Sequence, residues 1–167
     1  MNDPLKILVY GYGNPGRQDD GLGVALSEII ENWARENNMI TLHTDSNYQL
    51  NIEDASLISK FNLVIFADAS KEDIKGYSYT RLKPSAKVDF TMHSVAPAFI
   101  LKLCDEVYNK KPLTYLLHIR GYEWEFMQEM TPEARQNLED AAQFMKKIIK
   151  DYTMAPRNGK RVMTRLT

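Results

Sequence analysis

The chain has 167 residues, of which 44% are hydrophobic and 26% charged, and its formal net charge is −1. This length fits one domain with a sizeable core, and a net charge so near zero gives no electrostatic reason to expect nucleic acid or an anionic membrane surface as a partner. The single cysteine, Cys104, excludes an internal disulfide and a thiolate metal cluster, and it is typical of a reducing compartment.

The N-terminal segment MNDPLKILVYGYG is not expected to be a secretory signal, because no basic stretch is followed by a long apolar run. No apolar stretch in the sequence reaches the roughly 18 residues that a membrane-spanning helix needs. We therefore predict a cytoplasmic protein with one domain, residues 1–152, followed by a basic extension, residues 153–167.

Short aliphatic runs alternate with amphipathic segments along the first half of the chain. Residues 5–10 (LKILVY) end at a glycine, which is typical of a buried parallel strand. Apolar side chains repeat at helical spacing from Gly21 onward, and Asn51 is a good N-cap for a short helix. Further strands are predicted for residues 40–44, 63–67 and 77–82, the last at a sheet edge.

The second half repeats this alternation. Pro97 opens a helix, residues 113–119 (LTYLLHI) predict a buried strand, and Thr131 with Pro132 supplies the N-cap and first position of a final helix. Alternating strands and helices predict an α/β fold, a three-layer α/β/α sandwich with a mostly parallel sheet.

Three polar residues follow strand ends or lie in adjoining loops, where ligands bind in open α/β sheets. Asp20 follows the first strand, Asp68 follows the third, and His93 precedes the helix at Pro97. Two carboxylates and an imidazole suit a divalent metal such as zinc, nickel or manganese. Each also has a structural interpretation, the acids as helix or turn caps and the histidine as a hydrogen-bonded surface residue.

The first loop also contains G-x-G-x-x-G at Gly11, Gly13 and Gly16, a pattern that dinucleotide-binding loops share. The predicted helix begins after two carboxylates, however, and these would repel a pyrophosphate. Pro15 lacks an amide donor, and the acid expected about 20 residues on is not cleanly placed. The glycines are therefore interpreted as turn residues that present Asp19 and Asp20.

The segments GNPGRQDDGLG, FADAS and MHSVAP together resemble the nickel–iron hydrogenase maturation endopeptidases, and the match extends from Ile7 through Ile119. The resemblance implies a twisted five-stranded sheet between helices, with one strand antiparallel. It also implies an activity, namely removal of a short C-terminal peptide from the precursor of the hydrogenase large subunit after nickel insertion.

The resemblance assigns Asp20, Asp68 and His93 to the three metal contacts, although some members have glutamate where this chain has Asp20. The implied nickel is supplied by the precursor, with zinc or another divalent ion as a substitute in vitro. Substrate contacts are predicted for Asn14, Asp19 and Ser94. The group that activates the attacking water stays open.

Two other functions remain as alternatives: a metal-reading chaperone without catalytic activity, and a nucleotide-binding α/β enzyme that uses the glycine loop. Cys104 lies on the apolar face of its helix and is interpreted as a structural thiol. His118 is expected to be a packed or hydrogen-bonded strand residue. For the aromatic residues that follow it, Tyr122, Trp124 and Phe126, we expect core packing of at least two, with partner binding as the alternative.

Overall fold

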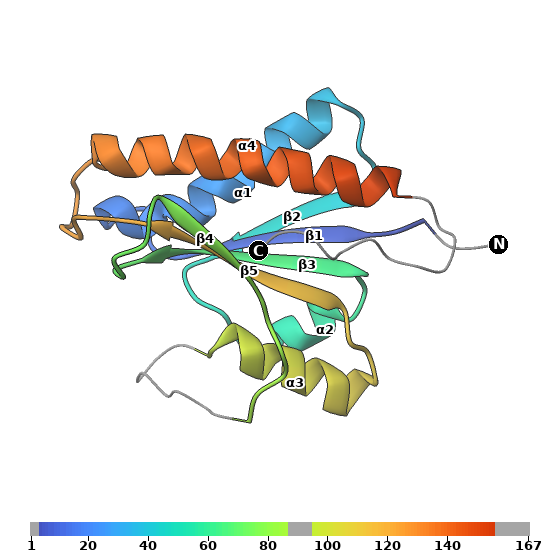
Figure 1. Ribbon diagram of the computed structural model, residues 1–167. Coiled ribbons are helices and arrows are strands. Elements are labelled where there is room, and N and C mark those ends of the chain that lie inside the picture. Colours follow the sequence, from blue (N-terminus) through green and yellow to red (C-terminus); the bar gives the residue numbers. More distant parts are fainter. Residues whose placement is uncertain (1–3, 87–94, 156–167) are drawn as a thin grey trace.

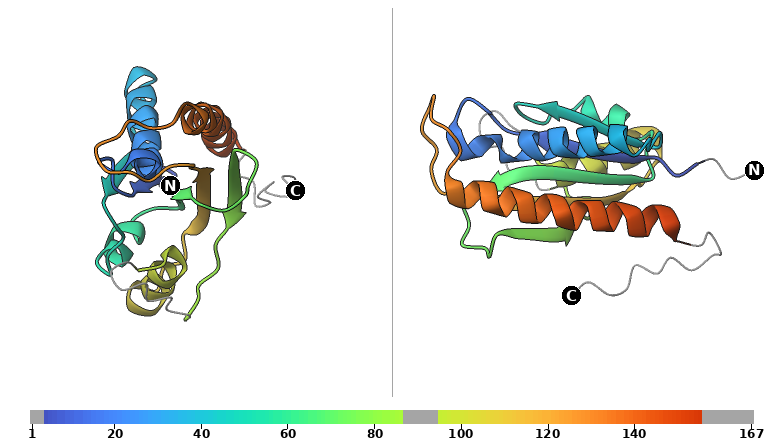
Figure 2. Two further views of the ribbon diagram at one scale, coloured as in Figure 1. Left: turned by 90° about the vertical axis from the view of Figure 1, so that its left-hand side faces the viewer. Right: turned by 90° about the horizontal axis from the view of Figure 1, so that it is seen from above.

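The computed structural model describes residues 4–86 and 95–155. A five-stranded sheet lies between two layers of helices, as Figures 1 and 2 show, with strand order β2-β1-β3-β5-β4. Strands β1, β2, β3 and β5 run parallel, whereas β4 is antiparallel to β5 at one edge. The predicted fold class and the single antiparallel strand are confirmed.

The elements have the following bounds. The strands are β1 (Ile7–Tyr12), β2 (Leu42–Asn47), β3 (Leu63–Ser70), β4 (Tyr77–Arg81) and β5 (Leu113–Arg120). The helices are α1 (Leu22–Glu36), α2 (Asp54–Ile58), α3 (Pro97–Tyr108) and α4 (Pro132–Met154), with a short 3-10 turn, η1 (Gln18–Gly21), before α1. Within the described residues no helix has both the length and the apolar character required to cross a membrane.

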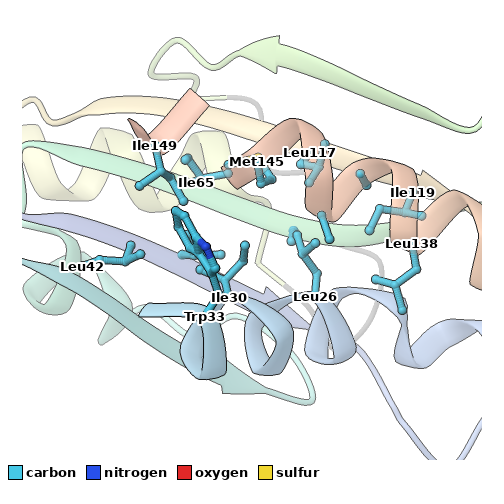
Figure 3. Close-up of a cluster of buried hydrophobic side chains, with 14 of the residues drawn as sticks. Leu26, Ile30, Trp33, Leu42, Ile65, Leu117, Ile119, Leu138, Met145 and Ile149 are labelled. Atoms are coloured by element: carbon cyan, nitrogen blue, oxygen red, sulfur yellow. The ribbon is translucent and has the colours of Figure 1, made fainter. Parts of the chain in front are cut away.

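Each face of the sheet has its own hydrophobic core, because successive strand residues point to opposite sides. Ile7 and Val9 of β1 pack into the core beneath α1 and α4, whereas Leu8 and Tyr10 pack into the core beside α2 and α3. Figure 3 shows the larger core, in which Trp33 of α1 and side chains of α4 converge on the sheet. Burial on both faces explains why the strand segments read as continuous apolar runs.

Several element boundaries differ from the sequence predictions, and β1 spans Ile7–Tyr12 rather than residues 5–10. Strand β2 begins at Leu42 rather than at residue 40, because Asn38 has a positive φ of 52° and a turn joins Met39 to Leu42. Helix α2 begins at Asp54 instead of directly after Asn51, whose backbone N–H donates to the Asp54 carboxylate. Strand β3 continues past residue 67 to Ser70, so Asp68 lies inside the strand rather than after it.

Two glycines allow α1 to lie directly against the sheet. A Cβ at Gly23 would lie 2.3 Å from the backbone oxygen of Ala67 in β3 and 2.6 Å from that of Tyr12 in β1. A Cβ at Gly11 would lie 2.0 Å from the backbone oxygen of Gly23. Backbone atoms cannot move aside as a flexible side chain does, so only glycine fits at both positions.

We expect Gly23→Ala to lower the free energy of unfolding by roughly 2–4 kcal/mol, because the added methyl group must push α1 away from β1 and β3. Urea denaturation measures this difference. The matched control is Gly16→Ala, where the only close neighbour of the new Cβ is a side-chain atom, Asn14 Oδ1 at 3.2 Å, and the expected change is below about 1 kcal/mol. Equal effects of the two substitutions would contradict the close-packing explanation.

Candidate functional site

Asp20 and Asp68 come together at the end of the sheet where β1 and β3 finish. Asp20 lies in the turn η1 between β1 and α1, and Asp68 is two residues from the end of β3. The two carboxylates are near enough for the charge of Asp20 to raise the pKa of Asp68. His93 and Ser94, the other predicted residues of this site, lie outside the described residues, between Ala86 and Val95.

The environment of Asp68 favours its neutral form. Burial is the largest cause and, with the neighbouring Asp20 charge, raises the pKa of the Asp68 carboxyl to about 7. Hydrogen bonds from the Ala69 backbone and the Tyr12 side chain oppose this shift and only partly offset it. Burial, together with the neighbouring charge and hydrogen bond of Asp68, holds the pKa of the Tyr12 hydroxyl well above its usual value. Tyr12 is therefore a site neighbour that sequence reasoning missed.

The loop before Asp20 is shaped by hydrogen bonds within the first glycine-rich segment. Asp20 Oδ2 accepts from the backbone N–H of Asn14 at 3.1 Å, and Asn14 Oδ1 accepts from the N–H of Gly16 at 2.9 Å. A Cβ at Gly13, whose φ is +133°, would lie 2.1 Å from the backbone oxygen of Asp20. Asn14 and the glycines thus fold this loop around Asp20. The substrate contact predicted for Asn14 stays a prediction.

Asp19, the adjacent acid, points into the protein and is completely buried. Its Oδ2 accepts from the backbone N–H groups of Tyr122 and Glu123 at 2.7 and 3.1 Å, and from the Thr131 hydroxyl at 2.8 Å. Its Oδ1 accepts from the Thr131 backbone N–H at 2.8 Å. The geometry thus gives Asp19 a structural task, while the substrate contact expected for it stays untested.

More hydrogen bonds join the same turn to the connection between β5 and α4. Gln18 Nε2 donates to Glu123 Oε2 at 2.8 Å, and Gln18 Oε1 accepts from the backbone N–H of Glu125 at 3.0 Å. Gln18 adopts a positive φ of 48°, which is uncommon for a residue with a side chain. No local sequence signal reveals these contacts, because their partners are more than 100 positions apart.

His118 lies beside Asp68 across the sheet. The two residues are in register between β3 and β5, and His118 is half-buried on the sheet face that Asp68 also occupies. Burial lowers the pKa of His118, and the nearby Glu72 partly opposes this effect. The strand pattern alone did not reveal that His118 lies next to Asp68, because this depends on the pairing of β3 with β5.

The expectation that at least two of Tyr122, Trp124 and Phe126 pack in the core is wrong. Tyr122 is 41% exposed and Phe126 is 66% exposed, while Trp124 is partly buried. These residues belong to the connection between β5 and α4, which projects at one end of the sheet and is drawn in orange at the left of Figure 1. Hydrogen bonds to Asp19 and Gln18 turn the backbone of this connection inward, so its large side chains are left at the surface.

In the described part of the chain, no group of three histidine, cysteine, aspartate or glutamate side chains is arranged to hold a metal ion. His93, which would complete such a group with Asp20 and Asp68, is not among the described residues. The two carboxylates alone offer a cation oxygen ligands from two separate elements, and oxygen ligands suit divalent ions.

Comparison with solved structures supports the fold. The [NiFe] hydrogenase maturation protease HycI from Thermococcus kodakarensis KOD1 is similar over 89% of this chain and 95% of its own, with TM-score 0.70 and 17% identity. The hydrogenase maturating endopeptidase HybD from E. coli is similar over 89% and 94%, with TM-score 0.64 and 20% identity. The hydrogenase 2 maturation peptidase from Thaumarchaeota archaeon SCGC_AB-539-E09 is similar over 87% and 98%, with TM-score 0.64 and 18% identity.

No protein-family model matches the sequence, and the search of curated proteins finds no significant match. At these low identities the structural likeness establishes a shared fold. The family that the motifs resemble and the family of these structural neighbours are the same.

We expect Asp19→Asn to lower the free energy of unfolding by roughly 2–4 kcal/mol, because an amide NH2 would face N–H donors that now bind a carboxylate oxygen. Chemical denaturation at neutral pH measures this loss. Asp20→Asn is the matched control, since its carboxylate accepts a hydrogen bond from the Asn14 N–H that the amide oxygen can keep. A control as unstable as Asp19→Asn would contradict the structural role of Asp19.

We expect Asp68→Asn to stabilise the protein at pH 8 by up to about 4 kcal/mol and to have little effect near pH 4. The folded-state pKa of about 7 lies above the ordinary value of 3.8. Between these values the folded protein binds the proton more tightly than the unfolded chain, so stability falls as the pH rises through this interval. Unfolding curves of both proteins from pH 4 to pH 8 test this. A difference independent of pH would show that ionisation of Asp68 is not the cause.

Proposed function

We propose that this protein is an endopeptidase that removes the C-terminal extension from the nickel-loaded precursor of a [NiFe] hydrogenase large subunit. The observation that carries the proposal is the pair of carboxylates, Asp20 and Asp68, at the sheet end of a fold that known hydrogenase maturation proteases share. The motifs that resemble that family contain both residues.

The carboxylate pair is suited to a cation. Asp68 is withdrawn from water and lies near a second negative charge, so its ionised form is unfavourable when the site holds only protein groups. A divalent ion between the two carboxylates would cancel this repulsion and displace the proton. We propose that His93, from the segment before α3, supplies the third contact, because a neutral imidazole is a good ligand for nickel.

In this proposal the nickel belongs to the substrate, and the protein recognises it. The precursor holds the ion, and Asp20, Asp68 and His93 complete its coordination. A precursor without nickel lacks this link between the two proteins, so its cleavage segment is not held at the site. Recognition of the ion thereby restricts cleavage to loaded precursors. Zinc or another divalent ion is proposed to substitute in vitro. The site of action is proposed to be the cytoplasm.

The two alternative functions make different demands on the site. A nucleotide-binding enzyme needs free glycine amides near a helix N-terminus. Here Gly11 packs on Gly23 and Gly13 packs on Asp20, so these glycines serve internal contacts. A chaperone that only recognises nickel needs the same three ligands as the protease, and it is distinguished by the absence of a released peptide.

We expect His93→Ala to abolish processing of the nickel-loaded precursor while the protein stays folded, because one of three protein contacts to the ion is lost. Mass spectrometry of the precursor before and after mixing detects the released C-terminal peptide, and circular dichroism reports the fold. The matched control is His43→Ala, which removes an exposed histidine of β2 and should leave processing unchanged. Full processing by His93→Ala would end the ligand role of His93.

A further inference from the structure

The connection between β5 and α4 presents large apolar side chains to solvent. We call the exposed side chains of Tyr122, Phe126 and Met127 the 122–127 surface; their exposed fractions are 41%, 66% and 94%. Figure 2 shows in its right-hand view that this connection, in orange, extends beyond the strands. Exposed apolar groups that lie together on one short segment often mark a contact surface for another protein.

Hydrogen bonds hold the backbone beneath the 122–127 surface in place, so the exposure of these side chains is not the result of a loose loop. Arg17 Nε donates to the Trp124 carbonyl at 3.0 Å, and the Met127 N–H donates to the Gly16 carbonyl at 2.9 Å. Asp19 accepts hydrogen bonds from the backbone N–H groups of Tyr122 and Glu123, and Gln18 accepts one from that of Glu125. A preformed surface loses little conformational entropy when a partner binds it.

Met127 occupies an unfavourable position for a side chain of its kind. Its φ of 58° lies in the left-handed region, which glycine and asparagine adopt readily and in which a bulky residue is strained. With 94% of it exposed, the side chain gains almost nothing from burial within this chain. Contact with a partner would explain why a methionine occupies this exposed position, since flexible methionine side chains adapt well to binding surfaces.

The charged groups beside this surface indicate the chemistry of the partner. The Arg17 guanidinium lies 5.4 Å from the centre of the Phe126 ring, and Lys71 Nζ lies 4.9 Å from that of Trp124. Neither Arg17 nor Lys71 belongs to an ion pair within residues 4–86 and 95–155. The same segment carries the exposed carboxylates of Glu123 and Glu125, so a complementary surface would combine apolar side chains at its centre with charged groups of both signs at its edge.

The 122–127 surface is continuous with the candidate site. Strand β5 ends at Arg120, which is in register with Ser70, two residues beyond Asp68. Tyr122 lies two residues after Arg120, whose guanidinium packs over the Tyr122 ring at 5.0 Å. A protein that brings a peptide segment to Asp20 and Asp68 thus has this surface directly beside it.

We propose that the 122–127 surface docks the folded body of the precursor, through an apolar patch edged by charged groups of both signs, and so positions the cleavage segment at Asp20 and Asp68. This inference rests on the proposed function for the identity of the precursor. The docking contact itself involves neither the nickel ion nor the bond that is cleaved.

The test compares the full-length wild type with the double variant Phe126→Ser, Met127→Asn. Asparagine suits the positive φ, so the substitution removes an apolar side chain without straining the backbone. Ile40→Ser is the matched control, because Ile40 is 87% exposed and precedes β2, at the other end of the sheet. The measurements are the Kd for the nickel-loaded large-subunit precursor by calorimetry, kcat and KM for its cleavage, and the unfolding midpoint.

We expect the double variant to raise Kd and KM by about tenfold or more, while kcat and the unfolding midpoint stay at the wild-type values and the control behaves as the wild type. A wild-type Kd in the double variant overturns the docking role even if cleavage is normal. If the wild type binds the precursor but releases no peptide, the proposed protease function fails, and a raised Kd of the variant still supports docking.

Two further results would also overturn the docking role. One is failure of the wild type to bind the precursor at all. The other is a wild-type dimer in sedimentation analysis that the double variant converts to a monomer, because a second copy of this chain would then be the occupant of the surface.

Discussion

The buried carboxylate of Asp19 is the contact on which the arrangement of this sheet end depends. It accepts hydrogen bonds from the first residues after β5 and from both donors of Thr131, whose hydroxyl in turn accepts from the Ala134 N–H and caps α4. One side chain thus fixes the turn before α1 to the connection before α4. Because a 3-10 turn rotates by about 120° per residue, Asp20 points elsewhere when Asp19 points inward.

The anchoring of Asp19 also fixes the position of the neighbouring acid, Asp20. Asp20 is held near Asp68, and the protein thereby maintains two carboxylates that repel one another in a partly dry place. Such an arrangement lowers stability at neutral pH, and in the proposed function a cation bound between the two carboxylates would relieve their repulsion. Carboxyl groups with a pKa raised in this way are common at functional sites.

The sequence predicted the layers of the fold well, since burial on both sheet faces produces apolar runs that alternate with helical stripes. It also predicted that Asp20 and Asp68 follow the first and third strands, at the sheet end where ligands bind, although Asp68 in fact lies inside β3. It did not predict the partners of Asp19 or the neighbourhood of His118, because both depend on contacts between distant parts of the chain. The exposure of Phe126 was missed for the same reason, as the backbone contacts that turn it outward have no local signature.

The most direct test of the account is mass spectrometry of the large-subunit precursor, in nickel-loaded and nickel-free forms, after incubation with this protein. The account predicts a released C-terminal peptide from the loaded form alone, because Asp20, Asp68 and His93 hold the precursor through its nickel ion. Release of the same peptide at the same rate from the nickel-free form would contradict recognition through the ion. An intact loaded precursor would contradict the protease activity itself.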